Sequence, residues 1–440
     1  MQFHLNRKVV LTAAIAMASQ VSYVQAAGYG INEQSASYLG TGFAGRASNA
    51  IDASISATNP AGISFLKGEQ ASVGVDVILE GGSFKGQRTG TFDGSPGPGG
   101  GYPAEGTGDT SGSTKDFQQT SFVPFGYYVM PVDEKLSLGL AAYAPYGIHL
   151  DYDDGWAGEW LGGKTLVEVV NLQGTVAYKF TDDVSLGFGL IASHVTGELT
   201  SNPFGGTPMS TKTKMEGDDT ILAWNVGAIW NVTESTTLGA SYHSKLDFNL
   251  SGDLTKTGAA PGKEKVELSL VMPEKLMFSA THKLDEQWTV MADATWTRWS
   301  RFEEFNVINS STGKSENYVP MNWKDTWALS VGTSYQLDES WLLRAGYMFD
   351  QAPVSNDTRT VRAPDANRNW FTLGANLKAS ENMNIDFAYA YVKLQDGKIN
   401  ESKHTAPGQA QTTPDAWYGS VSGEYKSSSH IFGVQLNYLF

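Results

Sequence analysis

Apolar and polar residues alternate with a period of two along most of the chain. In VSLGFGLIA, for example, Val184, Leu186 and Phe188 share one face, and Ser185 and Gly187 share the other. The same alternation recurs in WTVMADATW, in NIDFAYAY and in the final HIFGVQLNYLF. Because successive side chains of a strand point to opposite faces, these segments predict strands with one apolar face and one polar face.

Short acidic or polar turns and longer connections separate the predicted strands. The six short turns are centred on Asp133, Asp182, Glu234, Asp285, Asp338 and Asn382. The other connections are longer and rich in Gly, Ser, Thr, Asn or Pro, and residues 200–218 are interpreted as a comparatively short external loop. Six turns join twelve strands, and one strand before them and one after them make fourteen. We therefore predict an all-β fold, a 14-stranded antiparallel transmembrane β-barrel over residues 69–440, with both ends on the periplasmic side.

The length of the predicted strands separates a membrane barrel from a soluble β-sandwich, whose strands also alternate. The stretch from Trp288 to Trp296 has an aromatic residue at each end. Its residue steps of roughly 3.3 Å, tilted by about 40°, give a rise of about 20 Å, which is close to the apolar band of an outer membrane. Such a strand is long for a sandwich. Phe440 then ends a lipid-facing strand that closes the barrel, and we expect the barrel-insertion machinery to recognise it.

Two segments precede the predicted barrel. Arg7 and Lys8, followed by the apolar run Val9–Ala18, are typical of a secretory signal peptide, which we predict over residues 1–26. The apolar run is too short for a transmembrane helix. Residues 27–68 do not alternate and are rich in Ser, Ala and Gly, which favours compact turns and short helices. A barrel of this size has a lumen that can enclose such a piece, so we predict an N-terminal hatch, or plug.

Composition narrows the classes of function. The formal net charge of -15 argues against a nucleic-acid partner, which selects for clusters of Lys and Arg. The chain has no cysteine, so disulfides and thiolate metal sites are excluded. The sequence contains no G-x-S-x-G nucleophile elbow and no His pair at helical metal-binding spacing. We therefore expect no enzyme activity, no metal and no cofactor.

Several stretches resemble the FadL family of outer-membrane transporters. NEQSAS, FAGRAS and NPAG near the N-terminus, and APYGI, MPEKLMFSATHKLDEQW, NWKDTWALSVGTSY, FDQAPV and PDANRNWFTLGANL further on, fall where the family has similar stretches. The resemblance implies a monomer in the outer membrane of a Gram-negative bacterium, in contact with membrane lipids and lipopolysaccharide. It also implies transport of long-chain fatty acids or, in some branches of the family, of aromatic hydrocarbons. A general porin and a surface receptor are the alternative interpretations.

The resemblance also implies functional residues in the hatch. In the family, the NPAG motif lies near an opening in the barrel wall and is needed for transport. A purely structural interpretation exists as well, because Asn-Pro commonly begins a turn and Gly accepts a positive φ. The residues of the hatch motif are Asn59, Pro60, Ala61 and Gly62, and the further hatch residues are Asn32, Glu33, Gln34, Phe43 and Arg46.

The predicted lumen is polar, which bears on the route of a ligand. Inward positions include Asn171, Gln173, Asp293, Asp386, Gln435 and Asn437. A continuous axial path for an alkyl chain is therefore not expected, and an apolar molecule needs external capture, a pocket beside the hatch and a lateral exit. The resemblance implies that this exit lies at a kink in the third strand. The candidate residues there are Ala144, Pro145, Tyr146 and Gly147, and Pro145 lacks the N–H that a strand ladder uses. Alternatively, Pro145 simply ends the strand before a loop.

A fatty-acid carboxylate would need a basic partner, because an unpaired buried charge is costly. The candidates are Arg46 in the hatch, and Lys324, Arg344 and Arg368 in predicted strands. A structural ion pair at a girdle or rim is the alternative for each of them. The basic residues that bind the carboxylate in the family do not match positions of this sequence cleanly, so the preference between charged and neutral ligands stays open.

Overall fold

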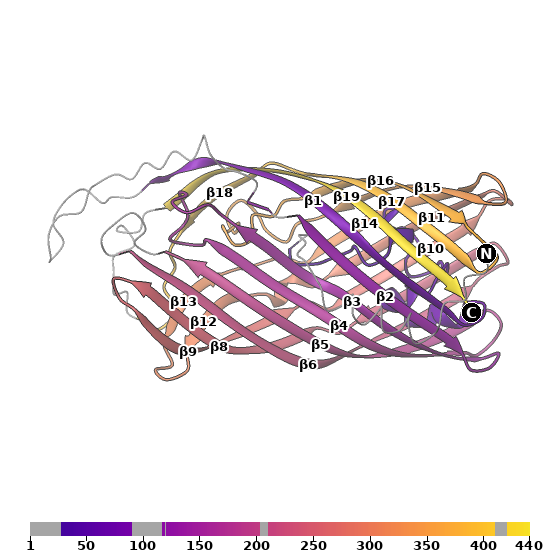
Figure 1. Cartoon of the computed structure of the whole chain (residues 1–440), viewed down its shortest axis with the longest axis horizontal. Helices are drawn as coiled ribbons and strands as arrows, with labels where there is room; N and C mark the ends of the chain where they lie inside the picture. The colour runs from indigo at the N-terminus through magenta and orange to yellow at the C-terminus, as the bar shows by residue number, and fades with distance from the viewer. Residues whose placement is uncertain (1–27, 90–116, 119, 203–209, 410–419) are drawn as a thin grey trace.

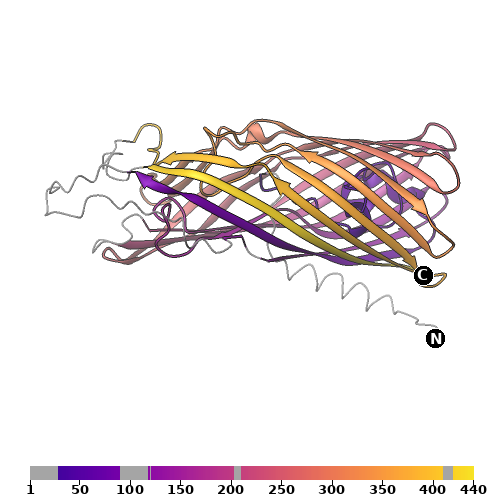
Figure 2. The ribbon, with the colours of Figure 1, turned by 90° about the horizontal axis from the view of Figure 1, so that it is seen from above.

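The barrel predicted from the alternating pattern is present in the computed structural model, which describes residues 28–89, 117–118, 120–202, 210–409 and 420–440. Nineteen strand segments in these residues form one antiparallel sheet that closes on itself (Figures 1 and 2). The predicted signal peptide lies outside the described residues. Closure matters because it leaves a membrane-embedded sheet without an unpaired edge.

Five pairs of strand segments follow one another end to end, so the nineteen segments make fourteen barrel strands. The segments are β1 (Gln70–Thr89), β2 (Ser121–Pro131), β3 (Leu136–Asp151), β4 (Lys164–Lys179), β5 (Val184–Ser201), β6 (Thr211–Asn231), β7 (Thr236–His243), β8 (Leu246–Gly258), β9 (Gly262–Met272), β10 (Lys275–Lys283), β11 (Trp288–Thr297), β12 (Glu304–Asn309), β13 (Ser315–Pro320), β14 (Thr326–Gln336), β15 (Trp341–Asp350), β16 (Arg368–Lys378), β17 (Met383–Leu394), β18 (Gly397–Ser402) and β19 (Ser420–Leu439). The end-to-end pairs are β7 and β8, β9 and β10, β11 and β12, β13 and β14, and β17 and β18. Closure joins β1 to β19, with Gln70 opposite Leu439. The predicted 14-stranded barrel is therefore confirmed in the described residues.

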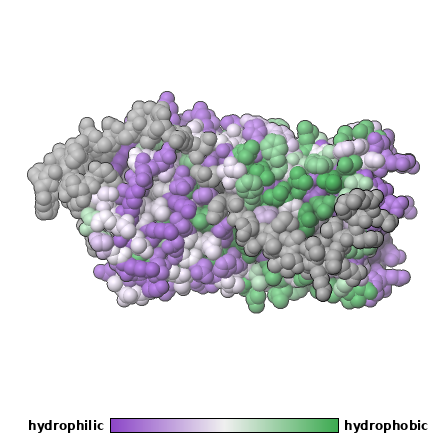
Figure 3. All heavy atoms as spheres, viewed as in Figure 1, coloured by the Kyte–Doolittle hydropathy of each residue, from purple (hydrophilic) through white to green (hydrophobic). Residues whose placement is uncertain are grey.

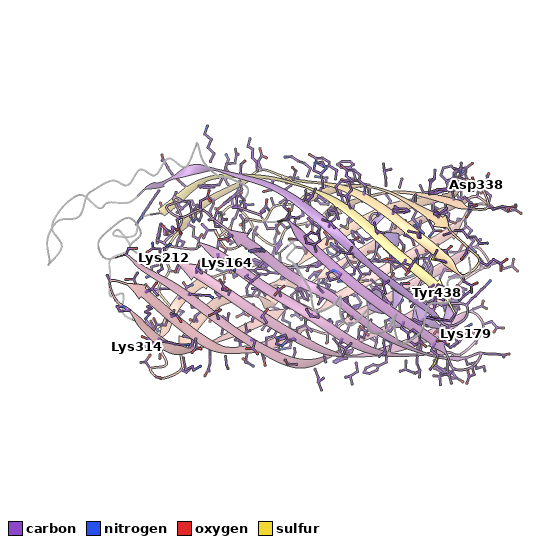
Figure 4. The ribbon with its side chains drawn as sticks, in the orientation of Figure 1. Lys164, Lys179, Lys212, Lys314, Asp338 and Tyr438 are labelled. Carbon is purple, nitrogen blue, oxygen red and sulfur yellow. The ribbon has the colours of Figure 1, made fainter. Side chains whose placement is uncertain are left out.

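The predicted short turns lie at one end of the barrel, together with the C-terminus (Figure 1). In three of the six turns, an aspartate side chain accepts hydrogen bonds from the N–H groups of the turn. A carboxylate oxygen of Asp285 accepts a hydrogen bond from the Trp288 N–H at 2.7 Å, and Asp338 accepts one from the Trp341 N–H at 2.9 Å. Asp338 lies at this end and Lys212 at the opposite end, where the long connections are (Figure 4). In the other three turns, the hydroxyl groups of Thr181, Thr233 and Ser380 accept these hydrogen bonds instead.

The face that carries the apolar residues changes along the barrel. In β6, Leu222 and Trp224 point outward on the short-turn half, with 74% and 42% of their surface exposed. On the other half of the same strand, Lys212 and Glu216 are exposed, whereas Met215 is buried. The face in Figure 3 shows apolar surface over the short-turn half and polar surface over the other. The 21 residues of β6 extend over roughly 70 Å along the strand, which at a tilt of about 40° is a rise of about 50 Å. This rise exceeds an apolar band of about 25 Å, so the barrel extends beyond the membrane.

The prediction of a loop over residues 200–218 is wrong. β5 continues to Ser201 and β6 begins at Thr211, so most of this stretch belongs to strands. Its polar composition resembles that of a loop because the outward face of these strands meets water rather than lipid.

An N-terminal segment, residues 28–68, lies inside the barrel near the short-turn end (Figures 1 and 2). It contains α2 (Ala36–Leu39), α3 (Ile55–Thr58) and the 3-10 helix η1 (Pro60–Phe65). η1 contacts β4, β5 and β6, and α2 contacts β16, β17 and β19. Helices this short are not stable alone, so the surrounding wall supplies the packing that holds them.

In the described part of the chain, no helix is both long and apolar enough to cross a membrane. Within the same residues, no group of three or more His, Cys, Asp or Glu side chains is placed to hold a metal ion.

Candidate functional site

The NPAG motif ties the N-terminal segment to the barrel wall. Asn59 is fully buried, and its amide nitrogen donates to the carbonyl oxygens of Ala47 at 2.6 Å and of Ala228 in β6 at 3.0 Å. Its side-chain oxygen accepts a hydrogen bond from the Ala61 N–H at 3.1 Å and so caps η1. Pro60 begins this helix, where a missing N–H leaves no bond unmade. One side chain therefore joins two parts of the segment to a wall strand.

Glycines on the inner wall let the motif approach closely. Gly187 in β5 and Gly227 in β6 face the motif, and a Cβ atom on either would overlap with Ala61 or Asn59. Gly62 is packed equally tightly, since a Cβ atom there would overlap with a side chain of α3. In the sequence, this close approach is marked by Gly187 on the polar face of VSLGFGLIA. The need for a glycine there becomes visible only when the N-terminal segment is packed against β5.

The wall has a break in pairing between β2 and β3. The two strands pair on the short-turn side of Ala142, and beyond it no ladder pair joins them in the described residues. At the same level, the register between β3 and β4 shifts between Tyr143 and Tyr146, which marks a bulge that contains Pro145. β3 nevertheless continues to Asp151, so Pro145 does not end the strand.

The first residues of the N-terminal segment occupy the position that β2 leaves. The Ile31 N–H donates to the Pro145 carbonyl oxygen at 2.9 Å, and the Gly147 N–H donates to the Tyr29 carbonyl oxygen at 2.8 Å. These bonds satisfy backbone groups of β3 that would otherwise lack a partner inside a membrane. The segment therefore completes the wall locally, and moving it would expose the edge of β3.

A cavity of about 50 Å³ lies between the N-terminal segment and the wall formed by β10, β11, β14 and β15. Gly30 and Ile31 line it, so the cavity and the pairing break share residues. Tyr38 and Trp299 supply aromatic surface. The volume suits a few water molecules, whereas pockets for drug-sized ligands measure about 300–1,000 Å³. A long ligand can enter only if side chains or part of the segment move.

The cavity brings together four of the five further hatch residues predicted from the sequence. Asn32, Gln34, Phe43 and Arg46 all line it, and Arg46 Nη1 donates to the Asn32 side-chain oxygen at 2.9 Å. Glu33 lies outside the cavity lining, and burial raises the pKa of its carboxyl group to about 7.

Three of the four basic residues predicted to bind a ligand carboxylate are already paired with aspartates of the protein. The buried ion pairs are Arg46 with Asp293 at 3.3 Å, Arg344 with Asp386, and Arg368 with Asp365 at 2.6 Å. All three arginines are buried, so these are interior pairs and not rim pairs. The prediction that Lys324 lies in a strand is wrong, because it is exposed in the connection between β13 and β14. Asn322 in that connection has a φ of +48°, which a strand does not accommodate.

Lys275, the first residue of β10, is a cavity residue that sequence reasoning missed. Its side chain lines the cavity, and its ammonium nitrogen lies 4.4 Å from the ring centroid of Tyr146 in β3. The alternating pattern could have indicated this position, because Lys275 lies on the same inward face of β10 as Met277 and Ser279.

The interior of the long-loop half contains many buried apolar residues beside a few buried charged ones. Residues from β4, β5, β6, β8, β9 and β12 enclose a second small cavity, with Leu199, Met215, Leu250 and Phe305 in its lining. Its apolar lining residues belong to a large cluster of buried apolar residues, which also includes Trp299 beside the first cavity. An apolar molecule arriving from outside would meet apolar surface there.

The architecture defines an integral outer-membrane β-barrel with an internal N-terminal segment, and comparisons with known proteins identify its family. A family model described as outer membrane protein transport protein (OMPP1/FadL/TodX) matches residues 16–440. Outer membrane protein P1 of Haemophilus influenzae is 29% identical over 470 residues, and the long-chain fatty acid transport protein of Escherichia coli strain K12 is 25% identical over 484 residues. Each alignment covers 99% of both chains. The chain therefore belongs to the OMPP1/FadL/TodX family.

Solved structures support the same fold. The chain is similar to a FadL homologue from Pseudomonas aeruginosa, with a TM-score of 0.82 and 23% identity over 94% of this chain and 99% of that chain. It is also similar to the toluene transporter TbuX of Ralstonia pickettii, with a TM-score of 0.64 and 18% identity over 94% of this chain and 99% of that chain.

Proposed function

We propose that this protein carries hydrophobic molecules, most specifically long-chain fatty acids, across the outer membrane. The ligand is captured by apolar residues in the interior of the long-loop half, passes to the cavity beside the N-terminal segment, and leaves sideways into the bilayer at β3. In this proposal the N-terminal segment is the hatch, and displacing it opens both the cavity and the wall.

The pairing break at β3 is the observation that supports this route most strongly. Residues 29–31 hydrogen-bond to β3 where β2 does not, and two of them also line the cavity. One movement of this piece would therefore enlarge the cavity and free a gap in the wall together. A lateral route suits an apolar solute because it avoids the polar lumen that contains Gln173 and Asp386.

A second candidate ligand class is aromatic hydrocarbons. Four aromatic rings cluster beside the cavity, with the Tyr29 and Trp323 rings stacked at 5.5 Å between centroids and the Phe302 and Trp323 rings edge-to-face at 4.9 Å. Trp299 lies 5.1 Å from Trp323 and lines the cavity itself. Aromatic surface of this kind packs well against a small aromatic ligand.

Uptake of labelled oleate and labelled toluene tests the proposal, in cells that lack their own transporter and carry this protein or its Asn59→Ala variant. We expect oleate uptake above background and its loss in the variant. Toluene uptake alone would assign the protein to hydrocarbons. If neither compound enters faster than background, the transport proposal fails, and ion conductance becomes the measurement that separates a porin from a surface receptor.

A further inference from the structure

The cationic side chains that face the cavity differ in how they are paired. Arg46 forms an ion pair with Asp293 and hydrogen bonds with Asn32 and Thr295. Lys275, in contrast, forms no ion pair within the described residues, and its ammonium group lies over the ring of a tyrosine. In a half-buried site, the attraction between an ammonium group and a ring face replaces only part of the hydration energy that the ammonium group has lost.

The carboxylates nearest to Lys275 do not supply the missing partner. Its neighbour Glu274 is engaged by Arg301 at 2.9 Å and by Arg298 at 3.2 Å. Asp350 lines the same cavity but lies beyond ion-pair distance from Lys275, and one of its oxygens has no hydrogen-bond partner in the described part of the chain. Within the described residues, the cavity thus contains an ammonium group without an ion-pair partner, and one carboxylate that would oppose an anion.

The remaining lining suits the two ends of an amphiphile. Thr297 and Thr326, which are opposite each other in the ladder between β11 and β14, bring hydroxyl groups to the lining. Phe43, Met277 and Trp299 add apolar surface to the same cavity. A carboxylate would be bound by the ammonium group and the hydroxyl groups, while the alkyl chain would contact the apolar side chains.

We propose that Lys275 receives the carboxylate of the ligand and makes the site selective for long-chain carboxylates over neutral molecules of the same shape. This inference rests on the proposed function and names the substrate class of the same cavity. A neutral ligand would exclude water from the ammonium group without replacing the hydrogen bonds that the water makes. A carboxylate replaces them with a charge-assisted hydrogen bond, so it binds more tightly. Tyr146 of β3 positions this lysine, and its hydroxyl group is held by the Pro273 carbonyl oxygen at 2.7 Å.

The test compares binding of oleate and of methyl oleate to the full-length protein in lipid nanodiscs. Lys275→Met should weaken oleate binding by about tenfold or more and leave methyl oleate unchanged, since it removes a charge-assisted bond but little volume. Lys275→Arg should restore most of the oleate affinity. Asp350→Asn, which removes the opposing charge, should strengthen oleate binding and leave methyl oleate unchanged. Lys283→Met, at the exposed end of the same strand, is the matched control and should change neither ligand.

The outcomes separate this inference from the function on which it rests. Equal effects of Lys275→Met on both ligands, or no effect on either, would overturn the assignment of Lys275 while leaving transport of hydrophobic molecules intact. If the unmodified protein binds neither ligand, the proposed function fails and the inference fails with it.

Discussion

At the scale of single residues, Asn59 concentrates hydrogen bonds to Ala47, Ala61 and Ala228 in one buried side chain. Asn59→Ala leaves at least two buried carbonyl oxygens and one N–H without these partners, so we expect local stability of η1 to fall by about 1–3 kcal/mol. Hydrogen–deuterium exchange over residues 55–65 measures the change.

A matched control for this prediction is Asn49→Ala in the same segment. The Asn49 amide nitrogen donates to the sulfur of Met291 at 3.3 Å, a weak acceptor, so this variant should exchange like the unmodified protein. If both variants exchange equally fast, the docking role of Asn59 is wrong.

We expect Glu33 to make the N-terminal segment sensitive to pH. Burial raises the pKa of its carboxyl group from 4.5 to about 7 in the folded protein. The contribution of Glu33 to the stability of the closed segment is fully present below about pH 4.5 and is lost as the pH rises through 7. The reason is that the buried carboxyl group must then lose a proton that it binds more tightly than the carboxyl group of the open state does. Opening of the first residues of the segment should therefore increase by up to about tenfold per pH unit between pH 5 and 7, and level off above.

The measurement for Glu33 is hydrogen–deuterium exchange over residues 28–34, compared with Glu33→Gln at each pH. Taking the ratio of the two proteins removes the intrinsic pH dependence of exchange. We expect the ratio to rise with pH and the Glu33→Gln protein to open equally at all values. A ratio that is constant from pH 5 to 8 contradicts the prediction.

At the scale of elements, the pairing between the N-terminal segment and β3 can be locked. Gly30 lies opposite Tyr146, and the flanking hydrogen bonds make them a non-hydrogen-bonded pair, whose Cα atoms are typically about 4.5 Å apart. Cysteines at both positions are within reach of a disulfide, and the natural chain has no cysteine to compete. We expect the oxidised double variant Gly30→Cys/Tyr146→Cys to lose oleate uptake and, on reduction, to recover the uptake of the weaker single variant.

The single variants Gly30→Cys and Tyr146→Cys control for the altered side chains. Uptake by the reduced double variant should match the weaker of the two. Uptake that continues after the disulfide has formed, as shown by mass spectrometry, would mean that this contact stays closed during transport.

At the scale of the whole molecule, the N-terminal segment should keep the barrel from conducting ions. Gly227→Ala places a Cβ atom in overlap with the Asn59 side-chain oxygen and 2.9 Å from Pro60 Cδ, so these side chains must move away from the wall. We expect single-channel conductance in planar bilayers to be low for the unmodified protein and several times higher for Gly227→Ala, because a displaced plug admits water to a polar lumen.

Gly174→Ala is the control for added volume in a wall strand. A Cβ atom at Gly174 meets nothing within 4 Å, so this variant should conduct like the unmodified protein. Mobility on unheated denaturing gels verifies that each barrel is assembled. An assembled Gly227→Ala barrel that stays closed would show that the segment tolerates the displacement.

The barrel itself could be predicted because it depends on local signals. Alternation sets which face of each strand meets lipid, and acidic residues such as Asp285 and Asp338 bind turn N–H groups within three residues of their own position. The inward positions Gln173 and Asp386 could be read from the same alternation, and both are buried. These features need no knowledge of which strands are neighbours.

The candidate site depended on contacts between residues that are far apart in the chain. Tyr29 meets Gly147, Arg46 meets Asp293, and Lys275 lies over the ring of Tyr146 only after the barrel has closed around the segment. Charge and polarity alone made four basic residues equal candidates for a carboxylate, because a sequence does not show which acids pair with them. The sequence by itself determined strands, turns and the polar lumen, since these follow from neighbouring residues. Only the tertiary structure decided which cation in the cavity lining has no ion-pair partner among the described residues, because that depends on the ion pairs formed across the barrel.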